Sequence, residues 1–334
     1  MNIIIPMAGK GSRLRPHTLT TPKPLVPVAG KPIVEWLAGD LIALCPEKID
    51  TIGFIIGDFG PEVEVNLIAV AERLGAKGKI FYQEEALGTA HAIYCAKELL
   101  EGPTIIAFAD TLFKTDYKIN PDDEGVIFVQ RVEDPSAFGV VKLAEEGYIT
   151  DFIEKPKTFV SDMAIIGIYY FRDGHKLRTQ IQHLIDNKIT TSGEYQLTDA
   201  METLKRGGAR YIPGEVVEWL DCGNKNATVN TNQRMLEIKL GQGQVHESVK
   251  TENSVLIQPC FIDEDVVIWN SVVGPHVSVG QGSIILNSVI SNSIIQKNSH
   301  IQSVITDNSM IGNHVKYDGR SKDLSIGDYT CIKE

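Results

Sequence analysis

Short apolar runs alternate with stretches of helical spacing over the first two thirds of the chain. The runs are typical of strands, and the stretches between them carry apolar residues three and four positions apart. Expected strands cover residues 3–5, 52–56, 79–82 and 104–109, and expected helices cover 32–44, 61–74 and 88–100. This alternation predicts an α/β fold with a mainly parallel sheet between helices. Ligands bind such sheets beyond the carboxyl ends of the strands, so functional motifs should follow strands directly.

A different pattern begins after a helix expected over residues 226–241, which ends at Gly241-Gln-Gly243. Aliphatic residues then recur every six positions, with Asn, Ser and Gly between them and a phase slip of one or two residues between groups. The groups are Ile262 and Ile268; Val273, Val279 and Ile285; Val289, Ile295 and Ile301; Ile305 and Ile311. This period predicts a short parallel β-helix of about three or four turns. The expected domains are therefore 1–241 and 242–334.

The first strand leads into a glycine-bearing, cationic turn. Gly9 and Gly11 let the backbone approach a ligand closely. Five cations precede the first acid, Glu35, although the chain has a formal net charge of −11: Lys10, Arg13, Arg15, Lys23 and Lys31. Backbone N–H donors beside fixed positive charges suit a polyphosphate. The turn is not a P-loop, and Leu14 stands where a dinucleotide-binding fingerprint has its third glycine.

The whole block resembles the signature of the sugar-nucleotide pyrophosphorylases, which join an NTP to a sugar 1-phosphate. The resemblance covers Ala8-Gly-Lys-Gly-Ser-Arg-Leu-Arg-Pro16 and Pro22-Lys-Pro-Leu25. It implies a Rossmann-like catalytic domain, with Arg13 as the catalytic arginine on the triphosphate and Lys23 as a second catalytic cation. It also implies nucleotide binding by Ala8, Gly9, Gly11 and Ser12. Several members of this family carry a similar C-terminal β-helix, which is left-handed.

The next motif, Gln83-Glu-Glu-Ala-Leu-Gly-Thr-Ala-His91, follows the strand that ends at Tyr82. The resemblance implies that Gln83, Gly88 and Thr89 bind the nucleotide at its base. A glutamine side chain offers one acceptor and two donors, which suits the amide edge of uracil or thymine. His91 is expected to be a helix residue rather than a catalyst.

Two aspartates are the candidate metal ligands. Asp110 follows the apolar strand over 104–109, and Asp221 lies in Trp219-Leu-Asp-Cys-Gly223. Mg²⁺ on a nucleotide is typically held by one or two carboxylates. The resemblance implies that both aspartates hold Mg²⁺ and that Asp110 is catalytic, although Ala109 stands where relatives usually have glycine.

The second half of the resemblance concerns the sugar phosphate. Its motifs are Phe138-Gly-Val, Glu154-Lys-Pro, Ile166-Gly-Ile-Tyr and Gly193-Glu-Tyr-Gln-Leu-Thr-Asp. They imply a sugar-phosphate site made by Gly139, Glu154, Lys155, Gly167 and Glu194, in which Lys155 also acts in catalysis by holding the sugar 1-phosphate. Many relatives have an asparagine where this chain has Ile165, so one sugar contact is absent.

The implied reaction turns an NTP and a sugar 1-phosphate into an NDP-sugar and pyrophosphate. dTTP or UTP is the expected nucleotide and glucose 1-phosphate the expected sugar, as in glucose-1-phosphate thymidylyltransferases and uridylyltransferases. Three alternatives stay open: a mannose-1-phosphate guanylyltransferase, a non-catalytic regulatory subunit on this fold, and a bifunctional enzyme whose β-helix is an acyltransferase. For an acyltransferase, His276, His300 and His314 invite attention, but three or four turns make a short platform.

Composition restricts the partners. The acidic balance argues against a general nucleic-acid binder, and no apolar run reaches the length of a membrane span. Five cysteines lack Cys-x-x-Cys spacing, which favours free thiols in a cytoplasmic protein: Cys45, Cys95, Cys222, Cys260 and Cys331. Each β-helix coil buries little apolar area alone, so a homo-oligomer is expected.

Overall fold

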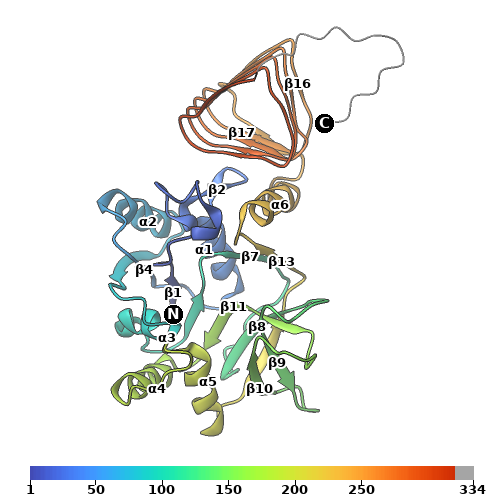
Figure 1. Cartoon of the computed structure of the whole chain (residues 1–334). Helices are drawn as coiled ribbons and strands as arrows, with labels where there is room; N and C mark the ends of the chain where they lie inside the picture. Colours follow the sequence, from blue (N-terminus) through green and yellow to red (C-terminus); the bar gives the residue numbers. More distant parts are fainter. Residues whose placement is uncertain (320–334) are drawn as a thin grey trace. The chain divides into compact units, whose positions relative to one another are not determined.

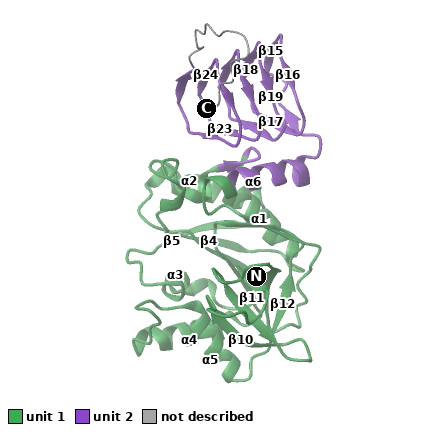
Figure 2. Ribbon diagram, turned by 45° about the vertical axis from the view of Figure 1, so that its right-hand side comes forward, with its two compact units in different colours: residues 1–26, 31–227 green, residues 27–30, 228–334 purple. Residues whose placement is uncertain are grey.

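The computed structural model describes residues 1–319 and divides into two compact units (Figure 2). The first unit contains residues 1–26 and 31–227, and the second contains residues 27–30 and the chain from residue 228 onward. The second unit therefore includes most of the helix expected over 226–241. Whether the functional domains divide at residue 241 stays a prediction.

A nine-stranded sheet forms the centre of the first unit. Its strands are β1 (Asn2–Pro6), β4 (Thr51–Ile56), β5 (Lys77–Tyr82), β6 (Thr104–Ala107), β8 (Gly125–Arg131), β9 (Gly139–Leu143), β10 (Ile149–Glu154), β11 (Met163–Phe171) and β12 (Tyr211–Glu215). Strands β6, β1, β4 and β5 are parallel neighbours, and β11 adds β8, β9 and β10 through antiparallel pairs. The predicted α/β class is confirmed, with an antiparallel extension on a parallel half.

Helices lie on both sides of this sheet (Figure 1). They are α1 (Ile33–Leu44), α2 (Pro61–Arg73), α3 (Thr89–Cys95), α4 (Gly174–Asp186) and α5 (Leu197–Arg206), with 3-10 turns η1 (Ser12–Leu14), η2 (Lys23–Leu25) and η3 (Lys97–Leu99). The helix expected over 88–100 ends at Cys95 and continues only as the turn η3. The strand expected over 104–109 ends at Ala107, so Ala109 and Asp110 lie beyond the sheet.

Four shorter strands complete this part of the chain. β2 (Pro27–Val28) and β3 (Lys31–Pro32) form a small hairpin, and β7 (Thr111–Lys114) pairs antiparallel with β13 (Glu218–Asp221). Because β7 follows Asp110 directly, its pairing brings two distant segments of the first unit together.

The second unit contains most of α6 (Lys225–Met235), from Thr228 onward, then the π-helical turn η4 (Leu236–Leu240) and a parallel β-helix. Its strands are β14 (Gln244–Val245), β15 (Lys250–Glu252), β16 (Val255–Leu256), β17 (Cys260–Ile262), β18 (Val267–Trp269), β19 (Val272–Val273), β20 (Val277–Val279), β21 (Ile284–Leu286), β22 (Val289–Ile290), β23 (Ile294–Ile295), β24 (His300–Gln302), β25 (Ile305–Thr306), β26 (Met310–Ile311) and β27 (Lys316–Asp318). They stack as three parallel sheets, which confirms the predicted left-handed β-helix class.

The prediction of three or four turns is wrong, because two of these sheets have five strands and the third has four. Stacking begins at Gln244, before the aliphatic period becomes visible. Lys250 pairs with Val267 and Val267 with Ile284, a step of 17 residues, whereas Ile284 pairs with His300, a step of 16. Three sixfold repeats would need 18, so the short coils explain the phase slip.

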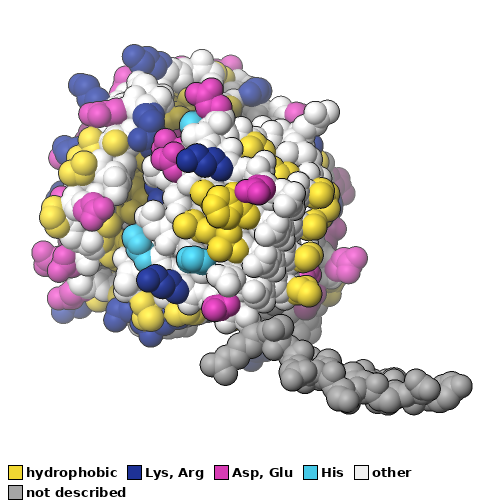
Figure 3. Space-filling model, turned by 90° about the horizontal axis from the view of Figure 1, so that it is seen from above, with side chains coloured by type: hydrophobic (Ala, Val, Ile, Leu, Met, Phe, Trp, Pro, Cys, Tyr) yellow, Lys and Arg dark blue, Asp and Glu magenta, His cyan; other side chains and the backbone are white. Residues whose placement is uncertain are grey.

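The slip also makes two predicted core positions wrong. Val289 and Ile305 are 45% and 87% exposed, because the shortened coil turns Ile290 inward in place of Val289. Val255 stacks in the same outward column, and Figure 3 shows hydrophobic side chains gathered on one face of the molecule. The other predicted residues from Ile262 to Ile301 are buried, and Ile311 packs against the same core. Self-association through exposed apolar area stays a prediction.

No helix among residues 1–319 is long and apolar enough to cross a membrane. Cys45, Cys95, Cys222 and Cys260 are free thiols, and Cys331 lies outside the described residues. The cytoplasmic location stays a prediction.

A buried asparagine ties together three parts of the second unit. Asn232 of α6 accepts hydrogen bonds from the Ala29 N–H at 2.9 Å and the Ser278 hydroxyl at 2.7 Å, and it donates to the His276 carbonyl at 3.3 Å. Gly30 lies so close to the Phe261 ring that a Cβ atom would come within 2.4 Å of it. The segment 27–30 is thus part of the packing of α6 and the β-helix.

We expect Asn232→Ala to lower the free energy of unfolding by about 2 kcal/mol or more, because a buried N–H and a buried hydroxyl lose their acceptor. Asn230→Ala is the matched control, since Asn230 is exposed on the same helix. Urea unfolding of both variants measures the difference. Equal midpoints for the two variants would contradict this account of the anchor.

Candidate active site

A cavity of about 390 Å³ opens beyond the carboxyl ends of β1, β5 and β6, where the sequence predicts the motifs to lie. Eleven of the predicted site residues line it: Ala8, Gly9, Gly11, Ser12, Arg13, Lys23, Gln83, Gly88, Thr89, Asp110 and Glu194. Residues that follow the carboxyl ends of three parallel strands therefore form a single site.

The turn after β1 is shaped by its two glycines in different ways. Gly11 has a φ of 58°, and a Cβ there would lie 3.0 Å from the Lys23 Cβ and 3.1 Å from the Thr18 Cγ2. The Thr18 hydroxyl donates to the Gly11 carbonyl at 2.8 Å and closes the loop. A Cβ at Gly9, in contrast, would meet nothing within 4 Å, so this position leaves room for a ligand.

Lys23 is a nearly buried cation that lines the cavity. Its side chain is only 10% exposed, and its Nζ lies 3.0 Å from the Asp110 Oδ2. A buried ammonium is stable only beside a counter-charge, and removing one partner of such a pair is strongly destabilising. The ion pair therefore joins η2 to the residue that follows β6.

The antiparallel pair β7 and β13 brings the second aspartate to the first. Asp221 lies opposite Thr111, and the Cys222 N–H donates to the Asp110 carbonyl at 3.0 Å. Burial, and then the negative charge of Asp110, raise the pKa of Asp221. Lys23, the Gly223 N–H and Arg13 lower the same pKa, by smaller amounts.

Two neighbouring carboxylates suit a divalent cation that also binds substrate phosphate. Asp110 and Asp221 are such a pair. Burial raises the pKa of Asp221 most, and the negative charge of Asp110, which a cation would neutralise, raises it further. Among residues 1–319 no three His, Cys, Asp or Glu side chains form a cluster able to hold a metal alone. The donor set therefore fits Mg²⁺ shared with a nucleotide and does not fit a cage made only of protein.

The segment after β5 holds its glutamine side chain in place. The Gln83 Nε2 donates to the Gly88 carbonyl at 3.2 Å and lies 3.3 Å from the His91 Nδ1. A Cβ at Gly88 would lie 2.5 Å from the Tyr195 carbonyl oxygen, so glycine is needed there for the chain's own packing. The Thr89 hydroxyl bonds to Gln196 and to the Leu197 N–H, which ties this segment to the start of α5.

Most of the predicted sugar-phosphate residues do not line the cavity; among the described residues only Glu194 does. Glu154 and Lys155 are 63% and 67% exposed and lie 3.7 Å apart, and Gly139 pairs with Glu154 across β9 and β10. Gly167 touches Phe108, whose N–H donates to the Gly167 carbonyl at 3.0 Å. Asp221 does not line the cavity itself, but Gly223, which contacts its carboxylate, does.

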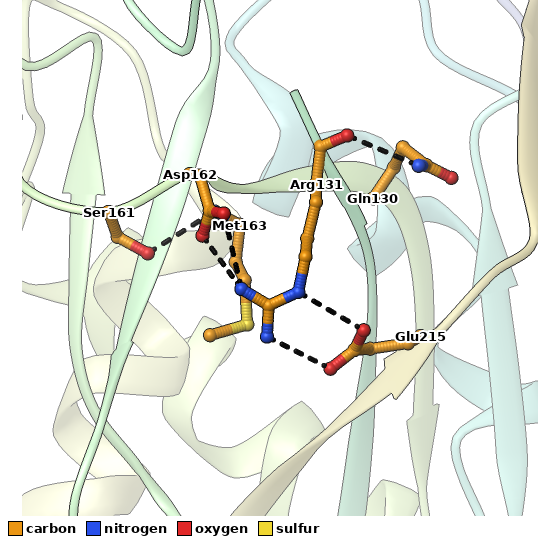
Figure 4. Close-up of polar contacts among 6 residues, drawn as sticks. All are labelled: Gln130, Arg131, Ser161, Asp162, Met163 and Glu215. Atoms are coloured by element: carbon orange, nitrogen blue, oxygen red, sulfur yellow. Dashed lines mark hydrogen bonds and ion pairs between the residues drawn. The ribbon is translucent and has the colours of Figure 1, made fainter. Parts of the chain in front are cut away.

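An arginine network supports the approach to β13 (Figure 4). Arg131, at the end of β8, donates to both carboxylate oxygens of Asp162 at 3.0 and 3.2 Å and to Glu215 at 3.3 and 3.4 Å. Glu215 ends β12, and β13 begins three residues later at Glu218. The network therefore holds the strand ends from which the chain runs to Asp221.

Sequence reasoning missed Phe108 and Gly223 as lining residues. Phe108 belonged to an apolar run that predicted only a strand, and its place after the last ladder residue, Ala107, was the available signal. A Cβ at Gly223 would lie 2.8 Å from the Asp221 carboxylate, so its spacing from Asp221 was the signal there.

Comparison with known proteins shows the family to which the chain belongs. The family model described as nucleotidyl transferase matches residues 2–238. A glucose-1-phosphate thymidylyltransferase of Streptomyces antibioticus is 30% identical, over 95% of this chain and 93% of its own length. A mannose-1-phosphate guanylyltransferase catalytic subunit beta of Drosophila pseudoobscura pseudoobscura is also 30% identical, over 84% of this chain and 70% of its own.

Among solved structures, a Bacillus anthracis protein described as a glucose-1-phosphate thymidylyltransferase superposes with a TM-score of 0.59 at 26% identity. The match covers 70% of this chain and 94% of that one. The family model spans more than half of the chain and includes every residue that lines the cavity. The chain therefore belongs to the nucleotidyl transferase family, as a sugar nucleotidyltransferase.

Proposed function

We propose that this protein transfers a nucleotidyl group from dTTP or UTP to glucose 1-phosphate, giving an NDP-sugar and pyrophosphate. The observation that carries the proposal is the cationic glycine turn and the Lys23–Asp110 pair around one cavity. The sugar phosphate oxygen attacks the α-phosphorus in line. The bond from that phosphorus to the bridging oxygen breaks, and pyrophosphate leaves with the electron pair.

The chain's own groups act by position and charge. Arg13 and Lys23 contact the triphosphate, and their charges stabilise the pyrophosphate as it departs. Ala8, Gly9, Gly11 and Ser12 line the turn that receives the phosphates, and the open space at Gly9 supports this role. Lys155 holds the sugar 1-phosphate and directs its oxygen, while Gly139, Glu154, Gly167 and Glu194 form the sugar side of the site.

Asp110 and Asp221 would hold Mg²⁺. A bound Mg²⁺ supplies charge neutralisation on the phosphate oxygens. In the protein itself, the Lys23 ammonium pairs with Asp110 and the Gly223 N–H donates to Asp221.

A guanylyltransferase is the second candidate, because the guanylyltransferase relative has the same 30% identity as the thymidylyltransferase relative, although its match covers less of both chains. A regulatory subunit is less well supported, since Arg13, Lys23, Asp110 and Asp221 are all retained. The experiment that tests the proposal is pyrophosphate release from each NTP with a panel of sugar 1-phosphates. Highest activity with dTTP or UTP and glucose 1-phosphate supports it. Highest activity with GTP and mannose 1-phosphate selects the second candidate, and no activity with any pair overturns both.

Asp221→Asn should abolish most turnover without lowering the melting temperature. The pKa of Asp221 is raised in the folded protein, so its ionised form at pH 7 favours unfolding relative to a neutral group. A neutral amide removes the destabilising negative charge, and it also removes the anionic metal ligand. Asp151→Asn is the control, because Asp151 is exposed on β10. Calorimetry and the pyrophosphate assay measure the two effects, and a clear fall in melting temperature with Asp221→Asn would contradict the electrostatic account.

Arg13→Ala should lower kcat by roughly 100-fold or more, the usual effect of removing a group that stabilises transition-state charge. KM for the sugar phosphate should change much less, because the guanidinium matters most as pyrophosphate departs. Arg15→Ala should have a far smaller effect on kcat, since Arg15 does not line the cavity. A rise in KM alone would make Arg13 a ground-state binder.

A further inference from the structure

We propose that His91 is a positioning residue for base selection: it holds the Gln83 amide so that this side chain can only accept a hydrogen bond from the base. The inference rests on the proposed function in one respect, which is that Gln83 contacts a uracil or thymine ring. It adds a role to the expectation that His91 is a helix residue rather than a catalyst, since His91 lies on α3.

Two acceptors lie around the amide nitrogen of Gln83. The Gly88 carbonyl oxygen is 3.2 Å from Nε2, and the His91 Nδ1 is 3.3 Å from the same atom. An amide nitrogen has two hydrogens, so both are used by these neighbours. With the amide reversed, its oxygen would face the Gly88 carbonyl oxygen, which can only accept, so the Gly88 carbonyl fixes the amide nitrogen on this side. His91 therefore carries its ring proton on Nε2 and receives a hydrogen bond at Nδ1.

His91 contacts a residue that lines the cavity but does not line the cavity itself. Gln83 and Gly88 line the cavity, whereas His91 lies on α3 outside the set of lining residues. It contacts the amide nitrogen and leaves the amide oxygen as the atom that a ligand can meet. This geometry distinguishes a positioning role from direct contact with the nucleotide.

A Gln83 amide oxygen that can only accept a hydrogen bond favours some bases over others. Uracil and thymine each carry one ring donor on the pairing edge, the N3–H, so the Gln83 oxygen must receive it. Cytosine has an unprotonated N3 at the same position, and an acceptor facing it is unfavourable. Reversing the amide would relieve that conflict, but the two acceptors on Nε2 oppose the reversal. The fixed Gln83 amide therefore discriminates UTP from CTP, although the two nucleotides have almost equal size.

The test is the ratio of kcat/KM for UTP to kcat/KM for CTP in the full-length protein, measured by pyrophosphate release with a fixed sugar 1-phosphate. His91→Leu should lower this ratio by about tenfold, the effect of one hydrogen bond. His91→Asn should restore most of it, because an asparagine oxygen near the Nδ1 position can accept from Nε2. Neither variant should change kcat with UTP by a similar factor, since His91 touches no reacting atom.

A double-mutant cycle separates positioning from packing. If His91 acts through Gln83, His91→Leu should have no effect on the ratio in the Gln83→Ala background. Equal losses with UTP and CTP, or an unchanged His91→Leu effect in the Gln83→Ala background, would overturn the proposal. If the wild-type enzyme prefers GTP, the nucleotide assignment is wrong, and the same cycle with GTP against ATP tests the amide orientation, since guanine N1–H and adenine N1 differ in the same way.

Discussion

The Lys23–Asp110 ion pair is the constraint on which the nucleotide side of the molecule depends. A nearly buried ammonium requires a carboxylate, and the two residues are 87 positions apart in the chain. The requirement fixes η2 against the residue that follows β6. Asp221 lies beside the same carboxylate, and its pKa is raised first by its own burial and second by the negative charge of Asp110. The two neighbouring carboxylates thus lower the stability of the fold but provide ligands for a cation, as is common where function competes with stability.

Much of this site could be predicted because its parts follow apolar strands. Apolar runs such as Ile3–Ile5 and 52–56 predicted strands of a parallel sheet. Gln83 and Asp110 each follow such a run, so the parallel order of the strands predicted that both lie at one edge of the sheet. The proximity of Asp110 and Asp221 could not be derived in that way. It depends on β7 and β13, two four-residue strands outside the main sheet, and such short strands carry too little pattern to specify a partner.

The β-helix shows a different limit. Its period identified the architecture, but burial depends on the length of each coil, and the coils change from 17 to 16 residues. An exact sixfold count then places Val289 and Ile305 in the core, although both are exposed. The side-chain orientation of Gln83 is equally hidden from sequence, because a glutamine donates or accepts according to neighbours such as Gly88 and His91 that only the fold supplies.

The two halves of the proposed site differ in how firmly they are built. Lys23 is tied into the fold, whereas Glu154 and Lys155 are exposed and pair with each other. Exposed ion pairs contribute little to stability, at most about 1 kcal/mol, so an arriving phosphate can separate this pair at small cost. A buried pair cannot be separated so easily. The nucleotide side is therefore preorganised, and the sugar side depends on its ligand to fix the two charged groups that would hold it.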